Sequence, residues 1–269
     1  MRYYLLNPLS NNGIKPINFD KDFIDITKID AKDFFSKLNK EDEVVIIGGD
    51  GTLNHLANDI YDLKVTNNIY LYPNGSGNDL IKDINGKLNE ENLINNYLIN
   101  LPLAKVNGRE LRFINDMGFG LDGFCCEEAD KLRKISPQKK INYVAIALRG
   151  LLRDYKSKHA TITVDDKTYE FDNVWLAPTM KGRYYGGGVK IAPNQDRNSD
   201  LLTLVIYHTK SKFKSMVFFP TIFTGDHIKK KDMISVFTGK KIHVKFSSPC
   251  AAQIDGETIL NVEEYFAEL

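Results

Sequence analysis

The sequence predicts two domains of different classes: an N-terminal α/β domain with a parallel sheet, and a C-terminal antiparallel β-sandwich domain with one prominent helix. Three observations lead to this prediction. The chain has 269 residues, which suggests roughly two domains at about 150 residues each. Its first hundred residues alternate short apolar runs with helical patterns, as α/β proteins do. From about Val106 onward, strand-like segments follow one another instead.

Hydrophobic periodicity predicts the N-terminal elements. Short apolar runs predict strands at residues 3–6, 44–47 and 69–72. Between them, apolar residues recur at helical spacing and predict two helices. The first group is Phe34, Phe35 and Leu38, and the second is Leu53, Leu56, Ala57, Ile60 and Leu63. Strands that alternate with helices predict a parallel sheet.

The C-terminal part reads as a series of strands interrupted by one helix. The predicted strands are residues 111–114, 160–164, 168–171, 174–177, 202–207 and 242–246. Ser136 and Pro137 are a plausible cap and first-turn pair for the helix. Its apolar stripe consists of Ile141, Val144, Leu148, Leu151 and Tyr155. We therefore expect an antiparallel sandwich with one prominent helix.

Composition excludes several classes of protein. The chain carries 36 Lys and Arg against 35 Asp and Glu, with 42% hydrophobic residues. These values exclude a disordered chain, a collagen and a protein that coats nucleic acid. No signal peptide and no run of 18 apolar residues is present, so we expect a cytosolic protein. The cysteines Cys125, Cys126 and Cys250 are odd in number, which favours reduced thiols.

Positive charge is concentrated in the second half of the chain. Residues 131–158 carry +8 and residues 210–245 carry +7, although the whole chain carries only +1. Two interpretations stay open: a basic face toward an anionic partner, or ordinary solvated helix and loop faces. The apolar segment 216–223 has two interpretations as well, as part of the core or as an apolar patch near a lipid entrance.

The strongest local signal is a glycine loop between a buried strand and an amphipathic helix. Residues 44–52 read VVIIGGDGT. Glycines let the backbone approach closely or adopt positive φ, and free N–H groups at a helix start favour a polyanion. A carboxylate among phosphates, at Asp50, makes sense only if it meets a metal or an acceptor hydroxyl. The alternative is a structural turn with Thr52 as the helix cap.

A second strand, glycine turn and helix start follow about 25 residues later. Residues 70–80 read YLYPNGSGNDL. On neighbouring parallel strands, both glycine loops would lie at the same sheet edge, which favours phosphate binding. Neither loop is a P-loop, because the Gly-Lys-Ser/Thr ending is absent. GFGLDG at residues 118–123 matches a dinucleotide pattern only weakly, because it follows the start of the antiparallel part. We interpret Gly186, Gly187 and Gly188 as a point of backbone crowding.

Taken together, these residues resemble the diacylglycerol kinase catalytic family, particularly its soluble bacterial lipid kinases. Six motifs occur in order along nearly the whole chain. They are NPLS at 7–10, GGDGTLN at 48–54, PNGSGND at 73–79, NDMGFGLD at 115–122, GGGVKIAP at 186–193 and DGE at 255–257. The family's architecture implies a nucleotide-binding domain over residues 1–106 and a β-sandwich lipid-binding domain over 107–262. It also implies that residues 263–269 return to the first domain.

The resemblance implies that ATP binds with its phosphates at the two glycine loops. The implied nucleotide contacts are Asn7, Pro8, Ser10, Thr27, Gly48, Gly49, Asp50, Gly51, Thr52, Asn54, Gly75, Ser76, Asn78 and Asp79. The implied catalytic residues are Asp255 and Glu257, together with Asp50, and which of the first two is the base stays open. A lipid hydroxyl is a poor nucleophile until a carboxylate accepts its proton, while Mg²⁺ neutralises phosphate charge.

A second Mg²⁺ site is implied by the family's structural metal loop. Here that loop reads RNSDLLT over residues 197–203, so the implied ligands are Asn198, the Leu201 carbonyl and Thr203. Asn198 and Ser199 stand where the family usually has carboxylates. Because hard cations favour charged oxygen ligands, this site would bind Mg²⁺ weakly.

The expected function is ATP-dependent phosphorylation of a lipid hydroxyl, with a diacylglycerol-like acceptor. We expect a lipid kinase that docks peripherally on the inner face of the membrane through its basic second domain. No nucleic-acid partner is expected, and the resemblance suggests a homodimer. Two alternatives stay open: a small-molecule kinase of the NAD kinase type, and a non-catalytic nucleotide- or lipid-binding relative. PNGSGND departs from the N-x-G-x-x-G-F expected of an NAD kinase.

Overall fold

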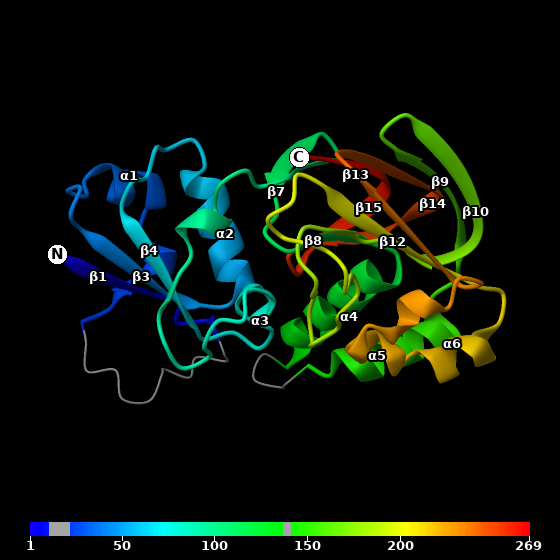
Figure 1. Cartoon of the computed structure of the whole chain (residues 1–269). Coiled ribbons are helices and arrows are strands. Elements are labelled where there is room, and N and C mark those ends of the chain that lie inside the picture. Colours follow the sequence, from blue (N-terminus) through cyan, green and yellow to red (C-terminus); the bar gives the residue numbers. More distant parts are fainter. Residues whose placement is uncertain (11–21, 137–140) are drawn as a thin grey trace. The chain divides into compact units, whose positions relative to one another are not determined.

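A computed structural model describes residues 1–10, 22–136 and 141–269. The chain forms two compact units, Met1–Leu101 and Pro102–Leu269 (Figure 1). The division falls five residues before the expected end of the first domain at 106, because residues 103–106 pair with strands of the second unit.

Unit 1 contains a five-stranded, mostly parallel sheet. Its strand order is β2-β1-β3-β4-β5. The strands are β1 (Arg2–Leu6), β2 (Ile24–Asp25), β3 (Glu43–Gly48), β4 (Asn68–Pro73) and β5 (Asn92–Leu93). Among the strands of the described residues of unit 1, only the β4–β5 pair is antiparallel. Residues 44–47 are fully buried, which explains why these four positions of β3 are all apolar. The predicted α/β class with a parallel sheet is confirmed.

Short helices connect the strands of unit 1. They are the 3-10 turns η2 (Ile26–Lys28) and η3 (Asn95–Tyr97) and the helices α1 (Ala31–Ser36), α2 (Asp50–Ile60) and α3 (Asp79–Asp83). Asp30 caps α1 by accepting the Asp33 N–H at 2.9 Å. The helix α2 buries Leu53, Leu56, Ala57 and Ile60, as its periodicity predicts.

Unit 2 is a ten-stranded antiparallel sheet that closes on itself. Its main path is β7-β6-β15-β14-β8-β11-β12-β10-β9, with β13 beside β12 and a further β14–β9 pairing. The strands are β6 (Leu103–Val106), β7 (Arg109–Arg112), β8 (Asp116–Phe119), β9 (Lys158–Val164), β10 (Lys167–Leu176), β11 (Thr179–Met180), β12 (Leu202–His208), β13 (Ile234–Gly239), β14 (Lys241–Ile254) and β15 (Glu257–Glu268). The predicted antiparallel sandwich is confirmed.

The core of unit 2 lies inside this sheet. Phe119 stacks on Phe246 with their ring centroids 4.1 Å apart, and Tyr265 meets Phe119 edge to face. The C-terminal part of β15 pairs with β6, for example Tyr265 with Val106. Residues 263–269 therefore lie in unit 2, whereas the family architecture implied a return to the first domain. Hydrogen bonding along a continuous β15 explains the difference.

Helices in unit 2 differ from the single predicted one. They are α4 (Leu121–Ile135), α5 (Tyr143–Arg149), the π-helix η4 (Gly150–Asp154), α6 (Lys212–Phe218), α7 (Thr221–Thr224) and the 3-10 turn η5 (Asp226–Lys229). The longest, α4, was not predicted. The predicted helix begins instead at Tyr143, where the Asn142 side chain accepts the Ala145 N–H at 3.0 Å. Ser136 ends α4, and Pro137 lies outside the described residues.

Two further details concern strand β10 and the helices. The strands predicted at 168–171 and 174–177 form one strand, β10, whose pairing with β9 shifts register between Phe171 and Val174. Such an irregularity lets one strand continue past a break in its alternation.

Among the described residues, no helix combines the length and the apolar character needed to cross a membrane.

Candidate functional site

The two glycine loops meet at one edge of the unit 1 sheet. Strand β3 ends at Gly48 and its neighbour β4 ends at Pro73, and these two residues are paired. The Asn74 N–H donates to the Gly48 carbonyl at 2.8 Å, which carries the contact beyond the strands. Because parallel strands present their carboxyl ends together, the loops lie side by side as the sequence predicts.

Close backbone contact explains Gly49 and Gly75. A Cβ on Gly49 would lie 2.8 Å from the Gly75 Cα, and a Cβ on Gly75 would lie 2.5 Å from the Gly49 Cα. Positive φ does not explain them, since Gly49 has a φ of −104°. The left-handed residue of the second loop is Asn78, with φ 53°. Its side chain exchanges two hydrogen bonds with the Gly75 backbone, at 2.9 and 3.0 Å.

The Asp50 carboxylate connects the two loops by hydrogen bonds, so its place in the first loop does not by itself require a ligand. Its carboxylate accepts the Asp79 N–H at 3.0 Å and the Leu80 N–H at 3.1 Å. These two residues begin α3, so the carboxylate stabilises the start of that helix. The expectation that Asp50 must meet a metal or an acceptor hydroxyl overlooked this possibility. With both oxygens holding backbone N–H groups, Asp50 fits a positioning role.

The NPLS motif at residues 7–10 is bound to the two glycine loops through side-chain amides. Asn7 donates from Nδ2 to Thr52 Oγ1 at 2.8 Å, and its Oδ1 accepts the Leu9 N–H at 2.9 Å. Asn74 donates from Nδ2 to Ser10 Oγ at 3.1 Å. Thr52 is therefore a partner of Asn7 and not the cap of α2, where Gly49 stands without a side-chain cap.

The remaining implied nucleotide contacts are more varied. Pro8, Thr27 and Ser76 are exposed, whereas Asn54 and Asp79 are buried. Thr27 follows β2 and bonds Asp25 at 2.6 Å, which places it beyond the carboxyl end of a strand next to β1. Asn54 accepts from the Asn58 amide within α2. Around Gly51, a Cβ would meet no heavy atom within 4 Å.

The N-terminus of α2 is the part of unit 1 best suited to an anion. This 11-residue helix starts at the glycine contact, and its N-cap residue Gly49 provides no side-chain cap. The first N–H groups of a helix lack partners within the helix, and the macrodipole makes this end positive. Such an end binds phosphate when the backbone can approach it closely.

In unit 2, Asp255 lies in a nest of backbone N–H groups. Its carboxylate accepts from Ile114, Asn115 and Asp116 at 2.6, 2.8 and 3.1 Å. The residue is 7% exposed and adopts φ 45° in the turn between β14 and β15. Glu257 opens β15 two residues later and is exposed. The DGE motif therefore contains one buried, fixed carboxylate and one carboxylate at the surface.

Two residues that the sequence analysis gave no role complete this nest. Arg197 is buried and donates to the Ile114 carbonyl and to Asn115 Oδ1, both at 2.6 Å. Gln253 accepts the Gly256 N–H at 2.7 Å and donates to the Asp116 carboxylate. A polar Gln253 between apolar residues of a buried strand was a signal that could have identified it.

Asp122 is a second buried carboxyl group beside this network. Burial raises its pKa from 3.8 to about 6, and the Gln253 amide and the Gly123 N–H partly oppose that shift. Its Oδ2 atom is buried and has no hydrogen-bond partner within 3.5 Å among the residues that the structure describes. A Cβ on Gly118 would lie 1.8 Å from that oxygen, and a Cβ on Gly123 would lie 2.1 Å from the Ala251 carbonyl oxygen. Close packing of α4 therefore explains these glycines.

The residues of the expected structural metal loop do not fit a cation. Gln195 donates from Nε2 to the Leu201 carbonyl at 3.0 Å, and the Thr203 hydroxyl donates to Gln195 Oε1. Asn198 is exposed, and the Lys181 ammonium group lies 2.9 Å from the Ser199 carbonyl oxygen. The buried Gln195 amide thus bonds the Leu201 carbonyl and the Thr203 hydroxyl, and a lysine supplies positive charge beside this loop. Within residues 1–10, 22–136 and 141–269, no three His, Cys, Asp or Glu side chains are grouped for a metal.

The glycine run at residues 186–188 and a pocket along α1 contribute no residues to the candidate site. Gly186, Gly187 and Gly188 all have positive φ and open space around them, so backbone conformation and not crowding requires glycine there.

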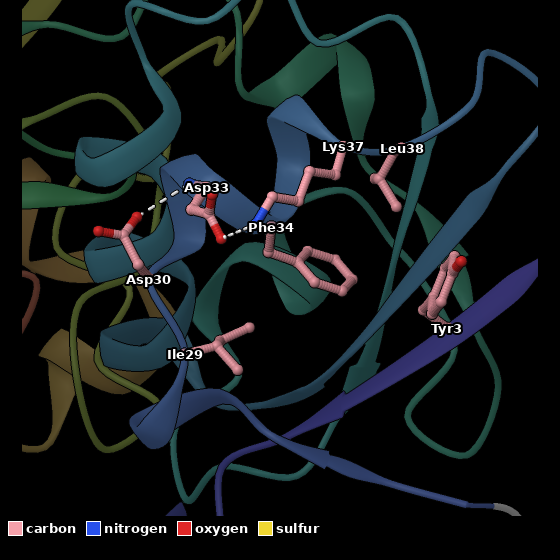
Figure 2. A pocket seen from close by; sticks show the side chains of 7 residues that line it. All are labelled: Tyr3, Ile29, Asp30, Asp33, Phe34, Lys37 and Leu38. Carbon is pink, nitrogen blue, oxygen red and sulfur yellow. Dashed lines mark hydrogen bonds and ion pairs between the residues drawn. The ribbon is translucent and has the colours of Figure 1, made fainter.

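Figure 2 shows a pocket of unit 1 along α1. None of its lining residues belongs to the glycine loops, and its polar groups are already paired: Asp30 caps α1, and Asp33 pairs with Lys37.

Two family models match the chain. The diacylglycerol kinase catalytic domain matches residues 14–103. The YegS C-terminal NAD kinase beta sandwich-like domain matches residues 115–265, which is more than half of the chain.

Individual relatives agree with these models. A diacylglycerol kinase of Mycobacterium tuberculosis is 26% identical over 212 residues, covering 76% of this chain and 67% of that protein. YtlR of Bacillus subtilis is 26% identical over 231 residues, covering 80% and 73%. The crystal structure of a diacylglycerol kinase from Bacillus anthracis has a TM-score of 0.66 at 21% identity, covering 98% of this chain and 92% of that one. This likeness supports the fold.

Proposed function

Because the chain belongs to the diacylglycerol kinase catalytic family, we propose that it transfers the γ-phosphoryl group of ATP to a lipid hydroxyl. A diacylglycerol-like lipid is the acceptor we favour. The observation that carries the proposal is the joined pair of glycine loops at the uncapped N-terminus of α2. ATP enters as a substrate together with its Mg²⁺, which neutralises charge on the phosphates.

Unit 1 supplies the phosphate site in this proposal. The open space at Gly51 and the positive end of α2 suit the β- and γ-phosphates. Asp50 holds the second loop against the first through Asp79 and Leu80. Asn7 holds Thr52, so the loop is fixed before the nucleotide binds. Preorganisation of this kind matters because phosphoryl transfer depends mainly on positioning and charge stabilisation.

Unit 2 supplies the carboxylates, and the structure favours different roles for the two. Asp255 is buried with three backbone N–H donors on its carboxylate, so we assign it to hold the turn. Glu257 is exposed two residues later, and we assign it as the general base. The lipid oxygen bonds to the γ-phosphorus, the bond from that phosphorus to the β–γ bridging oxygen breaks, and ADP leaves. The hydroxyl proton passes to the Glu257 carboxylate.

The test is a phosphoryl-transfer assay with ATP and Mg²⁺ against a panel of lipids in mixed micelles. The panel includes diacylglycerol, phosphatidylglycerol, a long-chain base and a polyprenol, with NAD as a soluble alternative acceptor. We expect a phosphorylated lipid, and we expect Glu257→Gln to lower kcat by on the order of a hundredfold or more without weakening ATP binding. Glu263→Gln on the same strand, also exposed, is the matched control.

The same assay can overturn the proposal. Phosphorylation of NAD and of no lipid would replace it with a small-molecule kinase. ATP binding without turnover on any acceptor would favour a non-catalytic relative. A Glu257→Gln enzyme with the kcat of the unmodified protein would remove Glu257 from the base role.

A further inference from the structure

The outer face of α6 exposes apolar side chains that the core of unit 2 does not use. Phe213 is 75% exposed, Val217 is 65% exposed and Met216 is 46% exposed. Because residues three and four apart lie on the same side of a helix, these three form one continuous face. Globular proteins rarely leave a Phe and a Val this open next to each other without a use.

The inner face of α6 is firmly packed, so this exposure does not come from a frayed segment. Ser215 and Phe218 are buried. The Tyr207 hydroxyl bonds Ser215, and the Tyr207 ring stacks on Phe218 with centroids 5.1 Å apart. Ser211 caps the helix by accepting the Lys214 N–H at 3.2 Å. The outward side chains are therefore presented by a fixed element.

The neighbouring helix η4 exposes a further apolar side chain next to α6. Lys212 donates from Nζ to the Leu152 carbonyl at 2.8 Å, and Leu152 is itself 38% exposed. Figure 1 shows α4, α5 and α6 grouped on one side of the unit 2 strands. We call the set Leu152, Phe213, Met216 and Val217 the α6 face.

Lysines flank the α6 face along the chain, and few of them are neutralised. Residues 210–232 contain six lysines and two aspartates, a net charge of +4. Both aspartates are already paired, Asp232 with Lys214 and Asp226 with Lys229. In the part of the chain that the structure describes, exposed Lys210, Lys230 and Lys231 have no ion-pair partner. Arg153, next to Leu152 in the chain, and Lys156, four residues after Leu152, are exposed as well.

Apolar side chains framed by lysines match an anionic lipid surface better than a protein. Protein interfaces are depleted in lysine, and their cores are depleted in charge. At a membrane, apolar side chains enter the boundary below the headgroups while Lys and Arg reach anionic headgroups. We propose that the α6 face docks this protein on an anionic bilayer, with Phe213 and Val217 inserted and Lys210, Lys230 and Lys231 at the headgroups. This docking proposal depends on the proposed function in one respect: the lipid acceptor of the kinase lies in such a bilayer.

The experiment measures sedimentation of the full chain with phosphatidylcholine vesicles, with and without phosphatidylglycerol. We expect binding only with phosphatidylglycerol, and weaker binding as salt rises, because exposed charges are screened over about 8 Å at physiological ionic strength. Phe213→Ser with Val217→Ser should weaken binding at least about tenfold. Lys210, Lys230 and Lys231 changed together to Gln should weaken it by about a hundredfold.

Matched controls lie elsewhere on unit 2. Leu260→Ser removes an apolar side chain that is 54% exposed on β15. Lys167, Lys240 and Lys241 are exposed, and changing all three to Gln alters the net charge equally. Both controls should bind vesicles as the unmodified protein does. Binding that is equal on neutral vesicles and indifferent to salt, or unaffected by the α6 variants, would overturn the proposal.

Two further measurements separate docking from self-association and from catalysis. If Phe213→Ser with Val217→Ser converts a dimer into a monomer by sedimentation equilibrium, the α6 face is a self-association surface and the proposal fails. With a short-chain diacylglycerol dispersed as monomers, the α6 variants should keep full kcat, and lose turnover only on vesicles. Vesicle binding that depends on the α6 face, without phosphorylation of any lipid, would sustain docking and reject the kinase.

Discussion

The Cα atoms of Gly49 and Gly75 approach so closely that a Cβ on Gly75 would lie 2.5 Å from the Gly49 Cα. Two loops from adjacent strands thus touch through their backbones, and any side chain at either position must push them apart. The geometry of the proposed phosphate site therefore depends on the absence of two methyl groups.

We expect Gly49→Val and Gly75→Ala to weaken ATP binding and to lower the free energy of unfolding by about 1–3 kcal/mol, as overpacking does. Gly51→Ala is the control for stability, because its Cβ would meet nothing within 4 Å. That variant should keep the unfolding midpoint of the unmodified protein. Calorimetry with ATP and urea unfolding measure both quantities. Unchanged ATP affinity in a folded Gly49→Val protein would contradict the phosphate loop.

Asp255→Asn should lower both stability and kcat, whereas Glu257→Gln should lower kcat alone. An amide offers one acceptor oxygen to the three N–H donors that now surround the Asp255 carboxylate. We expect a loss of roughly 3 kcal/mol in the free energy of unfolding. Asp166→Asn, at an exposed position, is the control. Equal stability of Asp255→Asn and the control would show that the nest contributes little.

Stability of the 195–203 loop should be independent of divalent cations. We expect the same thermal midpoint with EDTA and with Mg²⁺, because the Gln195 amide already bonds Leu201 and Thr203. Gln195→Ala leaves buried polar groups without a partner and should cost about 2 kcal/mol. Asn194→Ala, at the exposed neighbouring position, should cost nothing measurable. A midpoint that rises with Mg²⁺ in the unmodified protein would restore the cation.

Asp122→Asn should stabilise the protein at neutral pH. The pKa of the Asp122 carboxyl is raised by burial to about 6 in the fold, so the folded state binds its proton more tightly than the unfolded state does. As pH rises from about 4 to 6, the unfolded chain ionises first and stability is lost. The variant lacks this loss, so its advantage should grow by roughly 3 kcal/mol between pH 4 and 7.

Urea unfolding across that pH range measures the Asp122 effect, with Asp166→Asn again as the control. A difference between Asp122→Asn and the unmodified protein that stays constant with pH would contradict the shift. Burial raises the pKa of Cys125 and of Tyr185, and the nearby Asp122 charge raises both further.

The sequence by itself determined the elements whose residue pattern follows directly from which of their faces are buried. Strand β3 is apolar at residues 44–47 because both of its faces are buried, and α2 repeats its apolar residues because one face is buried. The glycine loops were predictable for the same local reason, since a strand, a glycine turn and a helix start are consecutive. The order of strands in the parallel sheet then placed both loops together.

Only the tertiary structure decided what depends on groups far apart in the chain. Helix α4 is rich in charged residues, and it is held by the close approach of Gly123 to Ala251. The role of Asp255 follows from N–H groups about 140 residues earlier, and no local pattern reports them. The Gln195 amide bonds the Leu201 carbonyl and the Thr203 hydroxyl in the loop where the resemblance implied a cation. A buried oxygen needs a donor of some kind, ammonium, amide or metal, and packing decides which donor reaches it.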